Sequence, residues 1–305
     1  MTFKKILVTG GTGLVGKALQ DVIPGASFMS SSDYDLRDSK QTYDMFNDYQ
    51  PQAVIHLAGK VGGLKANSEF LGDFFEENIL INTNVLLAAK EFGVQNLVSF
   101  LSTCIFPAEA EYPLFAEMLH EGEPHHTNFA YAYAKRMLEV QSRAYKQQHG
   151  LKYNCVTPTN IYGKHDNFNL ESSHVVPALI HKCYIALVED TPFVVWGSGE
   201  PLREFIYAPD VAKLAVWALD HPEHSNMILS PGQEVSIKEL VLEIVEAMNF
   251  DGEVIFDETK PDGQFRKPTS STLKSVLPDF KFTPLEEGIT ETVNWFVKEY
   301  GNCKK

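Results

Sequence analysis

The chain has few cysteines, and no two of them are close together. Cys104, Cys155, Cys183 and Cys303 are the only four in 305 residues, and none stands in a C-x-x-C spacing. A disulfide framework and a structural zinc site both need denser cysteines, so neither is expected. This scarcity favours reduced thiols, no bound metal and a cytoplasmic location.

Long apolar runs and an excess of basic residues are also missing. The first apolar run, residues 6–8, ends at Thr9-Gly10-Gly11 and is too short for a signal-peptide core or a membrane span. Lysine and arginine number 26 against 40 aspartate and glutamate, for a formal net charge of -14. Such a charge repels nucleic acid and anionic lipid, so neither is an expected partner, and any phosphate must be held by local geometry.

Strand-length apolar runs alternate with helix-length amphipathic segments through the first half of the chain. This alternation predicts an α/β fold with a Rossmann-type doubly wound parallel sheet. The predicted strands cover residues 5–9, 27–29, 53–57, 96–101 and 153–157, and the predicted helices cover residues 14–22, 40–48, 70–92 and 130–149.

After Pro158 the alternation loosens, returns briefly at residues 204–219 and gives way to a helix-rich C-terminal third. The pattern predicts a smaller, discontinuous α+β substrate domain. We expect the nucleotide-binding domain to comprise residues 1–163 and about 204–230, and the substrate domain residues 164–203 and 231–305. A turn at Pro261-Asp262-Gly263 leads into the basic segment Gln264-Phe265-Arg266-Lys267, which is either a solvated loop or a functional segment.

A glycine-rich turn links the first predicted strand directly to the first predicted helix. It reads Gly10-Gly11-Thr12-Gly13-Leu14-Val15-Gly16. In this context Gly10 permits a tight turn, Gly13 lets the backbone approach phosphates, and Gly16 allows the helix to pack closely on the strand. Residues 10–16 are therefore predicted to hold the pyrophosphate of a dinucleotide, and a glycine-rich turn without a ligand is the alternative.

The end of the second predicted strand bears on the choice between NAD and NADP. An acidic residue there would bind the ribose hydroxyls of NAD and repel the extra phosphate of NADP. Ser30-Ser31-Ser32 can donate to that phosphate, with Ser31 as the predicted contact, whereas Asp33 stands at about the spacing of a ribose-binding acid. NADP(H) is favoured on balance. Asp38 is predicted to face the adenine, with helix capping as the alternative.

Tyr131 and Lys135 stand four residues apart at the start of a predicted helix, so they share one face. The lysine is expected to favour the phenolate and lower the pKa of the tyrosine, which suits proton exchange with a substrate oxygen. Ser102 follows the strand that ends at Leu101, at the sheet edge where open α/β folds bind ligands, and can bond the same oxygen. The alternative is an amphipathic helix with an interfacial tyrosine and a snorkelling lysine.

The glycine spacing and the Tyr-x-x-x-Lys pair together resemble the extended short-chain dehydrogenase/reductase superfamily, whose members act largely on nucleotide sugars. Its dehydratases carry an acidic residue after the Ser/Thr of the strand edge, whereas this chain has Ser102-Thr103-Cys104. Over nearly its whole length the chain is similar to the GDP-L-fucose synthase family, although some bacterial members have arginine where the second strand here ends in serines. The strings that extend the resemblance are Lys60-Val61-Gly62-Gly63-Leu64, Pro158-Thr159-Asn160-Ile161-Tyr162-Gly163, His165-Asp166-Asn167-Phe168, Ser173-His174-Val175-Val176-Pro177-Ala178, Trp196-Gly197-Ser198-Gly199 and Arg203-Glu204-Phe205.

The resemblance implies a bifunctional epimerase and NADPH-dependent reductase. A 4-ketone acidifies the hydrogens on C3 and C5, so inverting both carbons needs a base and an acid. The resemblance assigns Cys104 as the base and His174 as the acid, while Tyr131 and Ser102 stabilise the enediolate oxygen and Tyr131 later protonates it as C4 is reduced. A buried, merely packing Cys104 and a structural His174 are the alternatives.

The resemblance also implies which residues bind GDP-4-keto-6-deoxy-D-mannose. Lys182 and Arg203 would neutralise its diphosphate, Trp196 would line the nucleotide pocket, and Asp262 would accept hydrogen bonds from ribose or guanine. Each of the four could instead be structural, for example as an Arg203 ion pair with Glu204. The further cofactor contacts implied are Leu57, Ala58, Gly59, Leu101, Ser102, Lys135, Pro158, Thr159, Asn160, Ile161 and His174.

Two other functions remain open from the sequence. One is another nucleotide-sugar 4-epimerase or keto-reductase, and the other is a catalytically silent NADP-binding scaffold. In the superfamily, the helices that correspond to residues 70–92 and 130–149 form a four-helix dimer interface, so a homodimer is expected.

Overall fold

The computed structural model describes residues 3–262 and 266–303 of the chain. Gly263, Gln264 and Phe265, which belong to the turn and basic segment singled out in the sequence, lie outside the described residues.

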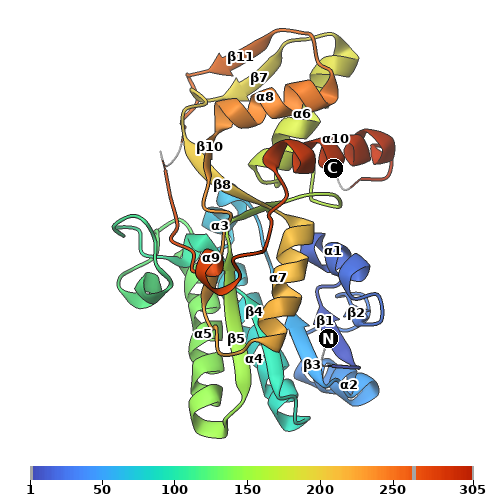
Figure 1. Ribbon diagram of the computed structural model, residues 1–305, viewed down its shortest axis with the longest axis vertical. Helices are drawn as coiled ribbons and strands as arrows, with labels where there is room; N and C mark the ends of the chain where they lie inside the picture. Colours follow the sequence, from blue (N-terminus) through green and yellow to red (C-terminus); the bar gives the residue numbers. More distant parts are fainter. Residues whose placement is uncertain (1–2, 263–265, 304–305) are drawn as a thin grey trace.

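Within the described residues, six parallel strands form one sheet in the order β2-β1-β3-β4-β5-β9, in the lower half of Figure 1. Because β1 pairs with both β2 and β3, the direction of winding reverses there, and open α/β sheets bind ligands at such a switch point. The Rossmann-type parallel sheet is therefore confirmed. The strands are β1 (Ile6–Thr9), β2 (Ser27–Met29), β3 (Ala53–His56), β4 (Asn96–Phe100), β5 (Lys152–Pro158) and β9 (Met227–Leu229).

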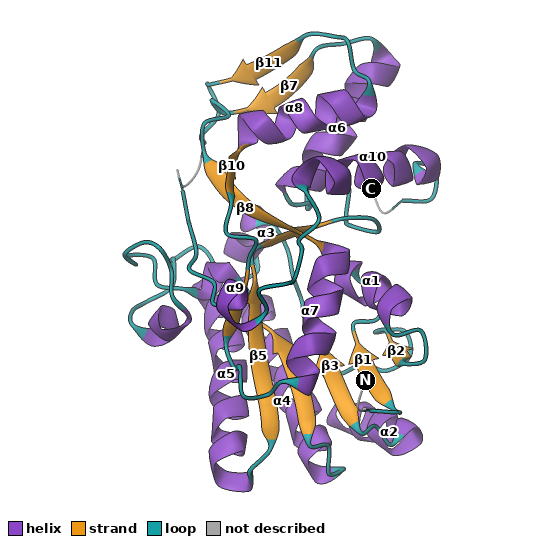
Figure 2. Ribbon diagram, in the orientation of Figure 1, coloured by secondary structure: helices purple, strands orange, loops and turns teal. Residues whose placement is uncertain are grey.

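Helices cover both faces of this sheet, as Figure 2 shows. Side chains alternate along β1, so Ile6 and Val8 pack on one face while Leu7 packs on the other. Each fully buried aliphatic side chain contributes roughly 1.5–3 kcal/mol, so the two layers hold the sheet rigidly. One face carries α1 (Leu14–Val22) and α7 (Ala208–Asp220), and the other carries α2 (Ser39–Tyr49), α4 (Leu71–Glu91) and α5 (Phe129–His149).

The upper part of Figure 1 is built on smaller sheets. Within the described residues, one sheet has the order β10-β8-β6 and another pairs β11 with β7. The strands are β6 (Asn160–Tyr162), β7 (Phe193–Trp196), β8 (Leu202–Tyr207), β10 (Glu234–Ser236) and β11 (Val254–Asp257), and the helices of the C-terminal half other than α7 are α6 (Val175–Glu189), α8 (Ile237–Met248), α9 (Leu273–Val276) and α10 (Leu285–Glu299). Of the segment at about 204–230, α7 packs on the large sheet and β9 belongs to it, whereas β8 pairs with β6 and β10. The boundaries of the two domains therefore stay a prediction.

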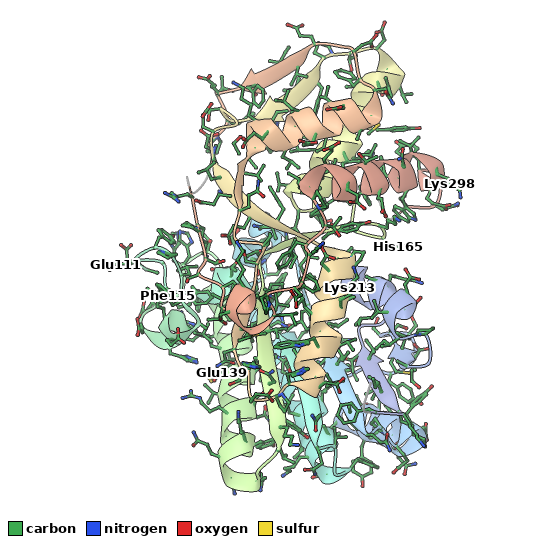
Figure 3. The ribbon with its side chains drawn as sticks, in the orientation of Figure 1. Glu111, Phe115, Glu139, His165, Lys213 and Lys298 are labelled. Carbon is green, nitrogen blue, oxygen red and sulfur yellow. The ribbon has the colours of Figure 1, made fainter. Side chains whose placement is uncertain are left out.

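A long connection, residues 101–128, leaves the carboxyl end of β4 and projects to the left in Figure 1, and Figure 3 labels Phe115 on it. It contains the short 3-10 helices η1 (Thr103–Ile105) and η2 (Ala116–His120). The backbone of Leu114 donates to the Pro268 oxygen at 2.9 Å and accepts from the Ser270 N–H at 2.8 Å. The connection is therefore joined to a segment of the C-terminal part, which we call the 266–271 segment.

Candidate active site

The glycine-rich turn lies against the switch point of the large sheet. Gly10 has a φ of 71°, and a Cβ there would come within 2.9 Å of the Ala58 nitrogen. A Cβ on Gly16 would approach the Gly10 oxygen to 2.5 Å, whereas one on Gly13 would meet that oxygen only at 3.4 Å. No side chain caps the first turn of α1. The free N–H groups and the open space over Gly13 fit a pyrophosphate, with Leu57 and Ala58 beside it.

Polar groups after β2 already bond to one another. Asp33 accepts hydrogen bonds from the nitrogen and hydroxyl of Ser30, and these bonds lower the pKa of its carboxyl group. Asp38 caps α2 by accepting hydrogen bonds from the Lys40 and Gln41 N–H groups, as expected if its role is helix capping. Ser31 is exposed at the strand end. Contacts of Ser31 and Asp38 with a cofactor stay predictions.

The predicted cofactor residues after the other strands gather along the carboxyl edge of the sheet. Gly59 follows β3, Leu101 follows β4 and Pro158 ends β5. A Cβ on Gly59 would lie 3.3 Å from the Lys135 Nζ, so the β3 edge closely approaches α5. Thr159 donates its N–H to the Leu229 oxygen, while Asn160 and Ile161 begin β6. Their contacts with a dinucleotide stay predictions.

Tyr131 and Lys135 lie in the first turns of α5 and are both buried. Lys135 Nζ donates to the Phe100 oxygen at 3.0 Å, and burial lowers its pKa to about 8. The expected lowering of the tyrosine pKa was wrong. Burial and then the neighbouring Cys104 raise the pKa of Tyr131, because the phenol loses water while the lysine ammonium is directed at a carbonyl oxygen. At neutral pH the phenol is therefore a proton donor.

Ser102 and Cys104 are joined at the end of β4. The Ser102 Oγ lies 3.1 Å from the Cys104 Sγ and also accepts from the Cys104 N–H, which caps η1. The Asn128 side chain donates to the Cys104 oxygen at 3.1 Å. The electrostatic effect of Cys104 on Tyr131 and Lys135 indicates that all three groups belong to one site.

A cavity of about 150 Å³ opens beside Cys104. The predicted residues Thr159, Asn160 and Arg203 line it, and so do residues that the sequence analysis did not assign to the site. These are Thr103, Glu204 and Lys267. Two sequence features lay close to these residues, since Lys267 ends the basic segment and Glu204 follows Arg203. Neither feature indicates that the two side chains line the same cavity as Cys104.

His174 precedes the first turn of α6, where it is the N-cap residue, and is exposed to solvent. Loss of solvation lowers its pKa. The neighbouring Ser172 and Ser173 backbone faces Gly63, so this loop lies next to the segment after β3. Within the described residues, no hydrogen bond or ion pair joins His174 to Cys104 or Tyr131. Their pairing as acid and base stays a prediction.

The predicted nucleotide-sugar residues fall into two groups. Lys182 Nζ lies 4.3 Å from the ring centroid of Trp196, whose side chain is 63% exposed and hence open to a ligand. Asp262 accepts from both the N–H and the hydroxyl of Ser198, so it holds the turn after Trp196. Arg203 instead lines the cavity beside Cys104.

Neither a metal centre nor a membrane span is found in the part of the chain that the structure describes. No group of three or more His, Cys, Asp or Glu side chains there could hold a metal ion. No helix there is long and apolar enough to cross a bilayer.

Comparison with known proteins places this site in a family. The model of the NAD dependent epimerase/dehydratase family matches residues 6–229. A GDP-L-fucose synthase from Dictyostelium discoideum is 47% identical over 99% of this chain and 98% of that protein, and one from Escherichia coli is 32% identical over 98% of both. A crystal structure of a GDP-L-fucose synthetase from Naegleria fowleri bound to NADP matches with a TM-score of 0.93 and 42% identity, over 99% of this chain and 95% of that one. The chain therefore belongs to the NAD dependent epimerase/dehydratase family, and within it to the family of the GDP-L-fucose synthases.

Proposed function

We propose that this chain converts GDP-4-keto-6-deoxy-D-mannose to GDP-L-fucose by inverting C3 and C5 and then reducing C4 with NADPH. The observation that carries the proposal is the contact between Ser102 and Cys104 at the same sheet edge as Tyr131 and Lys135. A reductase needs the serine, tyrosine and lysine, whereas a thiol at this position adds a group that can remove a proton. The names of the full-length relatives support the same activity.

NADP(H) is the proposed cofactor, and the chain's own residues fit it. The free N–H groups at the start of α1 would hold the pyrophosphate, and the Lys135 ammonium would bond the ribose next to the nicotinamide. When bound, NADPH supplies the hydride that reduces C4. The similarity of this chain to the Naegleria fowleri protein, whose crystal structure was determined with NADP bound, supports NADP over NAD.

In the epimerisation, Cys104 and His174 act from opposite faces of the sugar. The Cys104 thiolate takes the proton from C3, the electron pair moves into the C4 carbonyl as an enediolate, and His174 returns a proton to C3 from the other face. Cys104 then loses its proton to solvent and His174 regains one from solvent, and the same exchange at C5 completes the inversion without net oxidation or reduction. Hydrogen bonds from Tyr131 and Ser102 stabilise the negative oxygen.

In the reduction, Tyr131 completes the addition across the C4 carbonyl. Because burial and Cys104 keep the phenol protonated at neutral pH, Tyr131 can donate that proton to the C4 oxygen as C4 accepts a hydride. Lys135 then supports the phenolate that remains. Arg203 would hold the diphosphate, and Trp196 with Lys182 would hold the nucleotide end.

The test supplies GDP-4-keto-6-deoxy-D-mannose and NADPH in deuterated water and identifies the sugar product by NMR. We expect NADPH oxidation and GDP-L-fucose with deuterium at C3 and C5. Cys104→Ser should slow deuterium incorporation by at least about a hundredfold and leave some direct reduction of the unepimerised sugar. Cys303→Ser, which changes another partly exposed thiol, is the matched control.

Three results would contradict the proposal. A reduced product without deuterium would identify a plain keto-reductase, and inversion at C4 without net NADPH use would identify a 4-epimerase. NADPH binding without turnover would identify a silent scaffold.

We also infer that the chain is a cytoplasmic homodimer. Helices α4 and α5 pack side by side and expose apolar side chains, among them Leu80, Leu87 and Met137, which a second copy would cover. All four cysteines are free thiols, which supports a reducing compartment.

A further inference from the structure

Charged groups that the proposed reaction does not use surround Cys104. Lys267 and Glu204 line its cavity together with Arg203, yet neither carries a proton in the mechanism above. Lys267 is partly buried, and within residues 3–262 and 266–303 no hydrogen bond or ion pair holds its ammonium group. A cation left without such a partner beside a thiol needs an explanation.

The backbone around Lys267 is fixed by Glu204 and by the long connection. Glu204 Oε2 accepts from the Thr269 hydroxyl at 2.6 Å, and Oε1 accepts from the Thr269 N–H at 3.2 Å. Leu114 bonds to the residues on either side of Thr269. In Figure 1 the 266–271 segment accordingly descends from the upper part of the molecule to α9, beside the large sheet. Lys267 is therefore held two residues away from a rigid anchor.

Burial of the Glu204 carboxylate is unfavourable unless its hydrogen bonds compensate for the lost solvation. Its side chain is 3% exposed, and burial raises its pKa while the bonds from Thr269 and Ser230 act in the opposite direction. The described residues supply it with no cationic partner, and Glu234 adds like charge. A buried carboxylate of this kind is unfavourable for stability unless it is fully hydrogen-bonded. Its three bonds join β8 to Ser230, just after β9, and to the 266–271 segment.

We propose that Glu204 is a positioning residue that holds the 266–271 segment so that the Lys267 ammonium lies beside Cys104 and stabilises its thiolate. The inference rests on the proposed role of Cys104 as the base. The ammonium keeps its protons throughout, and only Cys104 gains the proton that leaves the sugar carbon.

Electrostatics in the site agree with this arrangement. Burial lowers the pKa of Lys267, whereas Cys104 acts to raise it and Arg203 to lower it further, so the three groups interact. The other titratable groups that interact with Cys104 are Tyr131 and Lys135. Lys135 is already bonded to the Phe100 oxygen, which leaves Lys267 as the cation without such an anchor among the described neighbours. A thiolate is the reactive form of cysteine, and a nearby cation increases its population.

The test measures the alkylation rate of Cys104 by iodoacetamide at neutral pH in the full chain with NADP+ bound, followed by peptide mass. Lys267→Met should slow this rate by roughly five- to tenfold, and Lys267→Arg should restore most of it. Thr269→Val is nearly isosteric and removes a hydrogen bond to Glu204 without changing any charge, so it should slow the rate by about two- to fivefold.

The matched control is Arg266→Met, which removes the same charge one residue away. Arg266 is exposed and pairs with Glu234, so alkylation of Cys104 should stay within about twofold of wild type. Cys303 in the same sample serves as an internal standard. Equal alkylation rates in Lys267→Met and Arg266→Met would overturn the proposal.

A second readout separates positioning of the thiolate from substrate binding. With the sugar nucleotide, Lys267→Met should lower kcat for deuterium exchange at C3 and C5 by about the same factor as the alkylation rate. A raised KM with unchanged alkylation would mean that Lys267 acts on the substrate alone, which refutes the proposal. If Cys104→Ser exchanged deuterium normally, the proposed function would fail instead, and the alkylation result would still stand.

Discussion

Lys135 is a buried residue whose charge changes close to neutral pH. With a pKa of about 8, its ammonium is present below that pH and is lost as the pH rises through it. We expect kcat/KM for NADPH, which reports the free enzyme, to fall about tenfold per pH unit above pH 8. Lys135→Arg stays charged and should move this alkaline limb to higher pH, although its activity is lower. A profile that stays flat up to pH 9 or beyond, in the wild type, would contradict the assignment.

His56 gives a second prediction for single residues, and it concerns stability. It is fully buried between the Thr9 hydroxyl and the Asn82 side chain, and burial lowers its pKa from 6.5 to about 3. The unfolded chain therefore binds a proton below pH 6.5 that the folded chain rejects, and this contribution to stability is lost as the pH falls from 6.5 toward 3.

Urea unfolding at about pH 7 and pH 5 measures this effect. Between the two conditions, the free energy of unfolding of the wild type should fall by roughly 2 kcal/mol more than that of His56→Gln. Comparison of the two losses removes the contribution of other titrating groups. Equal losses would show that His56 is not the group that rejects the proton.

The sequence predicted single site residues where local pattern determines position. Tyr131 and Lys135 share a helix face, and Ser102 with Cys104 follows a buried strand, so their common sheet edge could be expected. Glu204 and Thr269 are 65 residues apart and meet only through the tertiary fold. The pKa of Tyr131 was mispredicted because spacing along a helix does not reveal burial or the carbonyl oxygen that Lys135 prefers.

At the scale of elements, the glycine-rich turn and α1 allow a matched pair of substitutions. A methyl group on Gly16 would collide with the backbone of Gly10 and Gly11, whereas one on Gly13 has ordinary contacts but fills the space for a phosphate. Gly16→Ala should lower the free energy of unfolding by about 1–3 kcal/mol and weaken NADPH binding.

The free energy of unfolding of Gly13→Ala should lie within about 0.5 kcal/mol of the wild-type value. The same variant should bind NADPH at least about tenfold more weakly. Thermal unfolding and a fluorescence titration of NADPH measure the two effects. Wild-type affinity in Gly13→Ala would mean that the turn does not hold the pyrophosphate.

Elements in the regularly alternating first half of the chain were predictable, whereas strands after Pro158 were harder to assign. The predicted helix at residues 14–22 coincides with α1, and that at 70–92 differs from α4 by one residue at each end. The three-residue strand β9 was missed, although β2, which has the same length, was predicted with its exact bounds. Residues 204–207, which the sequence assigned to the nucleotide-binding domain, lie in β8, and β8 pairs with β6 and β10. A local sequence pattern can indicate a strand, but it does not determine with which other strand it pairs.

At the scale of the whole molecule, the proposed homodimer can be tested through its apolar helix pair. Leu80→Glu and Met137→Glu would each bury a charge in the interface, and the double variant should sediment as a monomer. Val188→Glu is the matched control, because Val188 is also exposed but lies near the end of α6. A wild-type chain that sediments as a monomer would refute the dimer.

The bonds between Leu114 and the 266–271 segment also bear on the order in which the chain becomes an enzyme. Chains fold from the N-terminus as they leave the ribosome, so the sheet and its glycine-rich turn can form early. The 266–271 segment, which carries Lys267, can bond to Leu114 only after synthesis has passed residue 270. A growing chain can thus have a folded dinucleotide site while the surroundings of Cys104 are not yet formed, and the proposed acid–base role of the thiol would be acquired last.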